Sequence, residues 1–351
     1  MRLKGSRVLV VGGAGFVGSN LVEHLLDQDV TRVQIVDNLL SSDVRNVSTD
    51  DRVELIEGSV ADDRVLRLIE PNIDFAWHLA CYHGNQSSIH DPVADHDNNL
   101  LTSLKLFNHL KDLPKLTKVV YAAAGCAVAE KTFGEARATT EEDPISLFHD
   151  SPYSISKIVG EMYGNYFWGR YGLPLVKTRF QNVYGPREIL GAGQWRGTPH
   201  TVWRNVTPTF IWKALHHIAL PLENAGQTSR DFIYVGDMAR GLALAAEHGT
   251  PGEVYNLASG VETSIAELAH VINGITQNPT APQQLPARDW DRSGRRFGST
   301  EKSRRVLGFE AQVSLRQGIE LTVEWTRANK ELIESCILQH DRHMQDLSLG
   351  G

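Results

Sequence analysis

The sequence predicts an α/β protein built on a doubly wound parallel sheet, with a second, smaller unit formed by later segments. Short apolar runs rich in β-branched residues alternate with helical patterns over the first half of the chain. Ten or more residues separate successive runs, which leaves room for the crossover that a parallel strand pair requires. The runs are apolar without alternation, as in strands that helices cover on both faces.

The elements of the predicted sheet follow one another closely along the chain. Apolar runs predict strands at 8–11, 33–36, 53–56, 75–79, 119–122 and 175–179. Patterns of helical period predict covering helices at 16–26, 94–112 and 152–171. Further strands are expected at 231–235 and 253–257, and a helical segment at 315–344.

The composition of the chain changes after Gly185-Pro186. Residues 187–230 are rich in Gly, Pro, Trp and Arg, and residues 276–300 are rich in Pro and Arg. A length of 351 residues suggests two units, at roughly 150 residues per domain. We therefore predict a first domain over 1–185 to which 231–260 returns, a second over 186–230 and 261–325, and a helical tail over 326–351.

Composition and charge exclude several classes of protein. Lys plus Arg number 35 and Asp plus Glu number 42, so a net charge of −7 gives no overall attraction to nucleic acid or an anionic membrane. The three cysteines form no CxxC spacing, and the histidines match no metal-ligand pattern. No signal-peptide core and no run of eighteen apolar residues occurs, so we expect a soluble cytoplasmic protein without a metal.

A glycine-rich loop follows the first predicted strand and opens the first helix. Gly12, Gly15 and Gly18 allow a tight turn and a close approach of backbone N–H groups to a pyrophosphate at the helix N-terminus. Asp37 ends the second strand nineteen residues beyond Gly18, where its carboxylate can accept both hydroxyls of an adenosine ribose. A carboxylate there repels a 2′-phosphate, so the pattern predicts NAD rather than NADP.

A second motif, Tyr153-Ser-Ile-Ser-Lys157, lies at the start of a helical pattern. Residues four apart share one helix face, so the Lys157 ammonium can lie close to the Tyr153 hydroxyl. There it can lower the pKa of the phenol and make Tyr153 an acid–base group near neutral pH.

Together these motifs resemble the extended short-chain dehydrogenase/reductases that act on nucleotide-sugars, a family with a Rossmann domain. The resemblance covers residues 5–325. Its carriers are Gly12 to Gly18, Asp37-Asn38, His78-Leu-Ala80, Asn98-Asn99, Tyr153 with Lys157, Arg179 to Pro186 and Arg230 to Val235.

The resemblance implies a role for particular positions. Those that would hold the cofactor are Gly12, Gly15, Phe16, Val17, Gly18, Asp37, Asn38, Ser59, Val60, Leu79, Ala80, Asn99, Ala122, Tyr153, Lys157 and Val183. Those that would meet the nucleotide-sugar are Ser87, Ser88, Asn182, Asn205, Val206, Arg230 and one or both of Arg288 and Arg292. Guanidinium groups suit a diphosphate because they offer several fixed donors. Ser59-Val60 departs from the family pattern, which has Asp before a small apolar residue.

The fifth strand departs from the family in another way. The family ends this strand in a Ser or Thr whose hydroxyl meets the substrate oxygen, and Ala124 stands there instead. Gln86, Ser87 or Ser88 could supply the missing group. Cys126, two residues on, occupies the place of the cysteine that exchanges a carbon-bound proton in GDP-mannose 3,5-epimerase. The partner lysine of that enzyme would align near Val206, so His200 and Arg204 are the candidates for the second acid.

The resemblance implies an NAD-dependent nucleotide-sugar epimerase that acts through a transient 4-keto sugar. Tyr153, with its pKa lowered by Lys157, would take the proton of the 4-hydroxyl. Cys126 would exchange a proton at C5 or C3. The favoured substrates are UDP-sugars for bacterial surface polysaccharide (O-antigen) synthesis. A C4 epimerase that uses hydride return alone and a catalytically weak regulatory NAD-binding protein remain alternatives. The family also implies a homodimer through the helices at 94–112 and 152–171.

Overall fold

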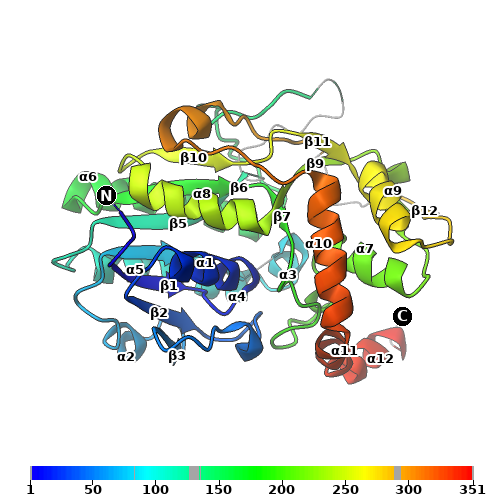
Figure 1. The fold of residues 1–351 in the computed structure, drawn as a ribbon, viewed down its shortest axis with the longest axis horizontal. Coiled ribbons are helices and arrows are strands. Elements are labelled where there is room, and N and C mark those ends of the chain that lie inside the picture. Colours follow the sequence, from blue (N-terminus) through cyan, green and yellow to red (C-terminus); the bar gives the residue numbers. More distant parts are fainter. Residues whose placement is uncertain (1, 83, 126–133, 135, 288–293, 350–351) are drawn as a thin grey trace.

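A computed structural model describes the chain except for residues 1, 83, 126–133, 135, 288–293 and 350–351. Its centre is a sheet of seven parallel strands in the order β10-β6-β5-β4-β1-β2-β3 (Figure 1). The strands are β1 (Arg7–Val11), β2 (Arg32–Asp37), β3 (Val53–Glu57), β4 (Phe75–His78), β5 (Lys118–Ala124), β6 (Leu175–Phe180) and β10 (Val254–Leu257). The predicted doubly wound α/β fold is confirmed.

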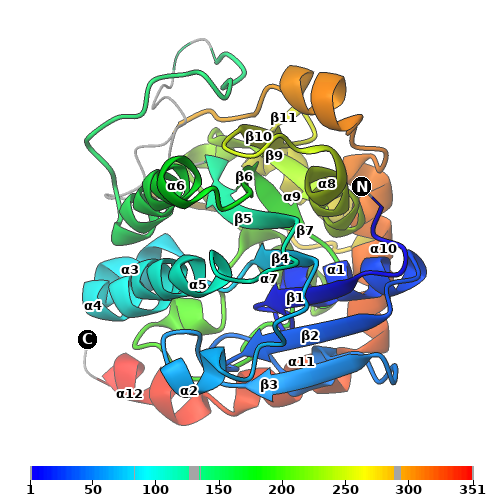
Figure 2. The same ribbon diagram turned by 90° about the vertical axis from the view of Figure 1, so that its left-hand side faces the viewer.

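Helices cover both faces of this sheet, which explains why its strands are apolar throughout. Figure 2 shows α1 (Phe16–Asp27) and α8 (Val235–His248) on one side, with α5 (Thr102–Leu110) and α6 (Pro152–Tyr171) on the other. Val8 and Val10 of β1 point into the core under α1 and α8, whereas Leu9 and Val11 point into the core under α5 and α6. Successive strand residues face opposite sides, so burial on both sides requires an unbroken apolar run.

Shorter helical segments connect these elements. They are α2 (Asp63–Leu66), α3 (Asn85–His90), α4 (Pro92–Asp95) and a π-helical stretch, His96–Leu101, that leads into α5. The helix predicted at 94–112 therefore consists of three consecutive helical pieces. The predicted helix at 152–171 is α6, which starts with Pro152 after the N-cap Ser151 and ends at Gly172 in the left-handed conformation.

A second unit lies beyond the carboxyl ends of the strands. Its described residues form a three-stranded sheet, a two-stranded sheet and three α-helices. These elements are β7 (Asn182–Tyr184), β9 (Ser229–Tyr234), β11 (Glu262–Ser264), β8 (Pro221–Glu223), β12 (Gln283–Leu285), α7 (Val206–Leu215), α9 (Ile265–Thr276) and α10 (Leu315–Ala328). Within the segment 231–260, β10 is a strand of the large sheet and α8 packs against one face of that sheet. In contrast, β9 pairs with β7 and β11 in the small sheet.

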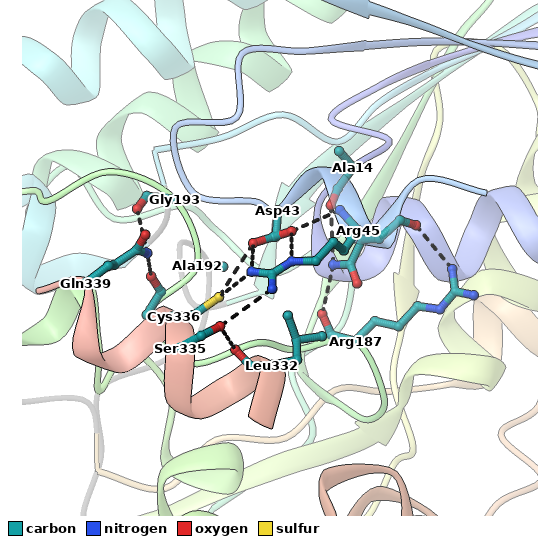
Figure 3. A network of polar contacts seen from close by, with 12 residues as sticks. Ala14, Asp43, Arg45, Arg187, Ala192, Gly193, Leu332, Ser335, Cys336 and Gln339 are labelled. Carbon is teal, nitrogen blue, oxygen red and sulfur yellow. Dashed lines mark hydrogen bonds and ion pairs between the residues drawn. The ribbon is translucent and has the colours of Figure 1, made fainter. Parts of the chain in front are cut away.

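Two further helices, α11 (Lys330–Leu338) and α12 (Asp341–Leu349), follow α10 and lie below it at the lower right of Figure 1. Cys336 of α11 is buried, and its thiol lies 3.1 Å from the Arg45 guanidinium, which also pairs with Asp43 (Figure 3). Gln339 donates to the carbonyl of Gly191 at 2.6 Å. These contacts tie the loop after β2 to the second unit. No helix in the described part of the chain is long and apolar enough to cross a membrane.

A buried ion pair joins α6 to β6. Arg179 donates from Nε and Nη2 to the two carboxylate oxygens of Glu161, each at 2.9 Å, and both side chains are almost fully buried. Removing one partner leaves the other charge buried and uncompensated. We therefore expect Glu161→Gln to lower the free energy of unfolding by about 3–5 kcal/mol, measured by chemical denaturation.

The matched control is Glu320→Gln, which breaks an exposed pair with Arg316. This substitution should lower the free energy of unfolding by less than about 1 kcal/mol. Equal effects of the two substitutions would contradict a structural role for the buried pair.

Candidate active site

The carboxyl ends of the parallel strands and the second unit enclose a cavity of about 590 Å³. The N-termini of α1, α6 and α7 open onto it, as do the loops after β1 to β4, the end of β5 and the loop after β6. Cavities outside the carboxyl ends of the strands, where the strand order reverses, are the usual ligand sites of doubly wound sheets.

The cavity gathers most of the residues that the sequence singles out. The described ones in its lining are Gly12, Gly15, Phe16, Val17, Gly18, Asp37, Asn38, Ser59, Val60, Leu79, Ala80, Ala122, Tyr153, Lys157, Val183, Ser87, Asn182, Asn205, Val206 and Arg230. Asn99 and Ser88 lie behind the lining. Cys126, Arg288 and Arg292 lie outside the residues that the structure describes.

The glycine loop has the shape that a dinucleotide requires. Gly12 has φ +89°, and a Cβ on it would come within 2.5 Å of the Ala80 nitrogen, so only glycine lets β1 and β4 approach here. A Cβ on Gly15 would meet only the Gly12 carbonyl, at 3.2 Å, and would otherwise project into open space. Gly15 is also the N-cap of α1 and brings no capping side chain. The first N–H groups of that helix are therefore accessible to a pyrophosphate.

Asp37 is fixed at the edge of the same cavity. Its Oδ2 accepts from the Ala14 N–H at 3.0 Å, and its Oδ1 accepts from the Leu39 N–H at 2.9 Å and the Ser42 hydroxyl at 2.8 Å. Burial raises the pKa of this carboxyl, while these bonds act in the opposite direction. The glycine loop and Asp37 together fit the pyrophosphate and adenosine ribose of NAD.

Tyr153 and Lys157 lie one turn apart at the start of α6. The buried Lys157 Nζ donates to the Ala122 carbonyl at 2.9 Å and lies 5.7 Å from the centre of the Tyr153 ring. The Tyr153 N–H donates to the Ser88 hydroxyl at 3.2 Å. Ser88 thus supports the backbone of Tyr153, whereas Ser87 lines the cavity. Ala124 presents a methyl group to the same space.

A buried polar network holds α6 in place behind the cavity. Asp95 accepts from the Ser156 hydroxyl and from the Asn99 amide, both at 2.6 Å, and Asn99 also accepts from the Tyr82 N–H at 2.7 Å. Burial raises the pKa of Asp95. Asn99 therefore holds Asp95, and Asp95 bonds directly to the helix that carries Tyr153 and Lys157.

The second unit supplies polar groups at the other end of the cavity. Arg230 is buried and donates from Nη1 to the carbonyls of Ser229 at 2.7 Å and Gly294 at 2.9 Å. Arg296 comes from the same arginine-rich run as the predicted Arg288 and Arg292, and it lines the cavity. His200 lines the cavity too. Arg204 uses Nη1 and Nη2 to bind the carbonyls of Ser41, Ala192 and Thr201.

Gln181 and Glu188 are polar residues of the lining to which the sequence analysis assigned no role. Gln181 follows β6, and its Cδ would lie 2.7 Å from a Cβ at Gly125, so the glycine makes room for the amide. Glu188 is 5% exposed, and its carboxylate accepts a hydrogen bond from the Asn205 amide. The sequence offers a weak signal for Gln181, which lies inside the Arg179 to Pro186 motif, and none for Glu188.

Comparisons with known proteins agree with this geometry. A family model described as "NAD dependent epimerase/dehydratase family" matches residues 8–258. The chain belongs to this family. A curated relative, the UDP-glucose 4-epimerase of Mycolicibacterium smegmatis, is 32% identical over 325 residues, which cover 92% of this chain and 98% of the relative.

Solved structures give the same result. The Bordetella bronchiseptica enzyme WbmF in complex with NAD⁺ and UDP is 54% identical, with a TM-score of 0.88 and coverage of 98% of each chain. A UDP-glucose 4-epimerase from Thermotoga maritima with UDP-glucose is 29% identical, with a TM-score of 0.82 and coverage of 92% of this chain and 99% of that one. The predictions of an NAD-dependent epimerase-type enzyme and of NAD as cofactor are confirmed.

The position of Asp37 predicts how the cavity selects its dinucleotide. We expect Asp37→Ala to weaken NAD binding by about 10- to 100-fold, because a charged acceptor contributes about 1.5–3 kcal/mol per hydrogen bond. Fluorescence titration of the cofactor-free protein measures the change. Discrimination against NADP should fall at the same time, since the repulsion of the 2′-phosphate is lost. Asp51→Ala, at an exposed position, is the control, and equal NAD affinities of the two variants would contradict the role of Asp37.

Proposed function

We propose that this protein is an NAD-dependent nucleotide-sugar epimerase that acts through a transient 4-keto sugar. The supporting observation is that one cavity joins the dinucleotide loop, the Tyr153–Lys157 pair and the cationic side chains of Arg230 and Arg296. The first two features suit oxidation of a bound hydroxyl group, and the cations suit a diphosphate.

The chain's own residues account for the proton chemistry. NAD, when bound, supplies an acceptor for the hydride of the sugar C4. Tyr153 takes the proton of the 4-hydroxyl, and the nearby Lys157 ammonium stabilises the resulting phenolate. The bond from Lys157 to the Ala122 carbonyl keeps the ammonium against the end of β5. The resulting ketone makes the C3 and C5 hydrogens acidic.

Cys126 is the proposed group for proton exchange at C5 or C3, because it follows the end of β5, where Ala124 lines the cavity. A C4 epimerase that needs no cysteine is the second candidate, and the similarity to UDP-glucose 4-epimerases favours it. In both cases another group must replace the hydroxyl missing at Ala124. Ser87 and Gln181 line the cavity and carry suitable donors and acceptors.

We further propose that the substrate is a UDP-sugar and that the protein works in the cytoplasm, in the synthesis of bacterial surface polysaccharide precursors. The Bordetella relative binds UDP, and the Thermotoga relative binds UDP-glucose. Asn205, Val206 and Arg230 would hold the nucleotide diphosphate, together with Arg288 or Arg292.

NMR of the protein with NAD and a panel of UDP- and GDP-sugars in D₂O tests the reaction. Formation of a new sugar with deuterium at C5 or C3 would support proton exchange by Cys126, and Cys126→Ser should then reduce that exchange at least tenfold. A new sugar without deuterium would identify the C4 epimerase. No conversion of any sugar in the panel would count against both candidates.

The Tyr153–Lys157 pair predicts a clear difference between two variants. Tyr153→Phe should lower kcat by about 10²–10⁴-fold, the usual contribution of an acid–base group, and leave the affinity for NAD within a few-fold. Tyr166→Phe, an exposed position on the same helix, should leave kcat unchanged. Equal activities of both variants would favour a regulatory protein over an enzyme.

We also propose a homodimer through α5 and α6. Ile155, Met162 and Tyr166 are each about half exposed on one side of α6, although they are large and apolar. Burial of such a row against a second copy is favourable at about 25 cal/mol per Å². We expect a sedimentation mass near twice 39.0 kDa. Met162→Glu should shift it toward the monomer, and Leu68→Glu, at an exposed site elsewhere, should not. A monomeric wild-type protein at micromolar concentration would contradict the proposal.

A further inference from the structure

Glu188 enters the cavity from a strained piece of backbone. The residue before it, Arg187, has φ +70°, a conformation that non-glycine residues rarely adopt. Arg187 is held there because its Nη2 pairs with Glu23 at 2.9 Å and its carbonyl accepts from the Asn46 amide at 3.2 Å. Figure 3 shows Arg187 beside the loop that carries Asp43 and Arg45. The Arg187 guanidinium is thus turned toward Glu23 while the next side chain lines the cavity.

The Glu188 carboxyl is buried with one oxygen unused. Its Oε1 accepts from the Asn205 amide, but no donor among the described residues lies within hydrogen-bonding distance of its buried Oε2. A buried carboxylate with an unsatisfied oxygen is costly, whereas the neutral acid can use that oxygen as a donor to a ligand.

One positively charged side chain, that of Arg204, favours the ionised form of Glu188. Arg204 nevertheless directs N–H groups to main-chain carbonyls. His200 from the preceding loop and Lys213 from α7 line the same cavity. Burial raises the pKa of Glu188 to about 7.

The surroundings of Glu188 favour an anion. Asn205 is the N-cap of α7 but makes no capping hydrogen bond with its side chain, which binds Glu188. The positive end of this ten-residue helix therefore faces the cavity without a capping side chain. An anion bound here would lie next to Glu188, and two negative charges in a buried space repel each other strongly.

We propose that Glu188 is a proton-holding residue of the substrate site, which donates a hydrogen bond from its neutral carboxyl to an anionic oxygen of the nucleotide-sugar. This inference rests on the proposed function, because it takes a diphosphate as the ligand. When the carboxylate form meets the ligand, one proton is taken from solvent and forms the O–H bond at Oε2. No other bond changes. Binding is then tight below about pH 7 and weakens above it.

Calorimetric titration of the NAD-loaded protein with UDP-glucose measures this coupling between about pH 6 and 8.5. Both phosphates of this probe are fully ionised between pH 6 and 8.5, so its diphosphate charge does not change across the range. We expect the affinity to fall by up to about tenfold per pH unit above 7. In two buffers of different ionisation enthalpy, the uptake at about pH 8 should approach one proton per ligand.

Two variants identify the side chain that takes up the proton when UDP-glucose binds. Glu188→Gln keeps a neutral donor of the same shape, so its affinity should be nearly independent of pH and exceed that of the wild type at about pH 8.5. A proton bound by His200 would give a pH dependence of the same sign, so His200→Gln tests this alternative. If Glu188 holds the proton, His200→Gln should keep the pH dependence of the wild type. Glu324→Gln, at an exposed site on α10, is the control for loss of one negative charge.

Each remaining result would overturn the inference. A wild-type affinity independent of pH, or an unchanged pH dependence in Glu188→Gln, would exclude Glu188 as the proton holder. Tighter wild-type binding at higher pH, with weaker binding by Glu188→Gln throughout, would show that Glu188 accepts hydrogen bonds as a carboxylate. Binding of UDP-glucose without proton uptake would leave the proposed function intact, whereas no binding at any pH would count against both proposals.

Discussion

The seven strands of the large sheet all run in one direction, so their carboxyl ends lie along one edge. The loops after β1 to β4 and after β6 therefore enter the same space, and α1 and α6 present their N-terminal residues there. Groups of different chemistry meet in this way without a long insertion: the glycine loop after β1, Asp37 at the end of β2 and Ala124 at the end of β5. The close approach of β1 and β4 depends in turn on Gly12, since a Cβ there would collide with Ala80.

The second unit completes the cavity through contacts between distant parts of the chain. Arg204 binds the Ser41 carbonyl of the loop after β2, and Arg187 pairs with Glu23 of α1. The C-terminal α11 adds a further tie through Cys336 and Arg45 (Figure 3). These interactions fix how far the part of the cavity lined by the second unit lies from the glycine loop, which matters because a small misplacement of reacting groups lowers a rate strongly.

Burial controls the charge state of the groups around the cavity. Desolvation raises the pKa of Asp37, Asp95 and Glu188, and the first two carboxyls accept more hydrogen bonds than the third. His78, the last residue of β4, is wholly buried and its pKa falls to about 3, so it stays neutral beside Lys157. The Lys157 ammonium donates to the main-chain carbonyl of Ala122, and no ion pair joins it to a carboxylate of the described residues.

The sequence by itself predicted the sheet, the glycine loop, NAD as the cofactor and the placing of Tyr153 and Lys157 on one helix. These features depend on spacing along the chain, because a strand, a tight turn and one helix face are local structures. Only the tertiary structure decided that Ser88 and Asn99 support α6 from behind the lining, that β9 pairs outside the large sheet, and that Glu188 meets Asn205. Such contacts join residues far apart in sequence, and a single buried carboxyl leaves no periodic pattern. Its burial, its partner and the strained residue before it exist only once the chain has folded.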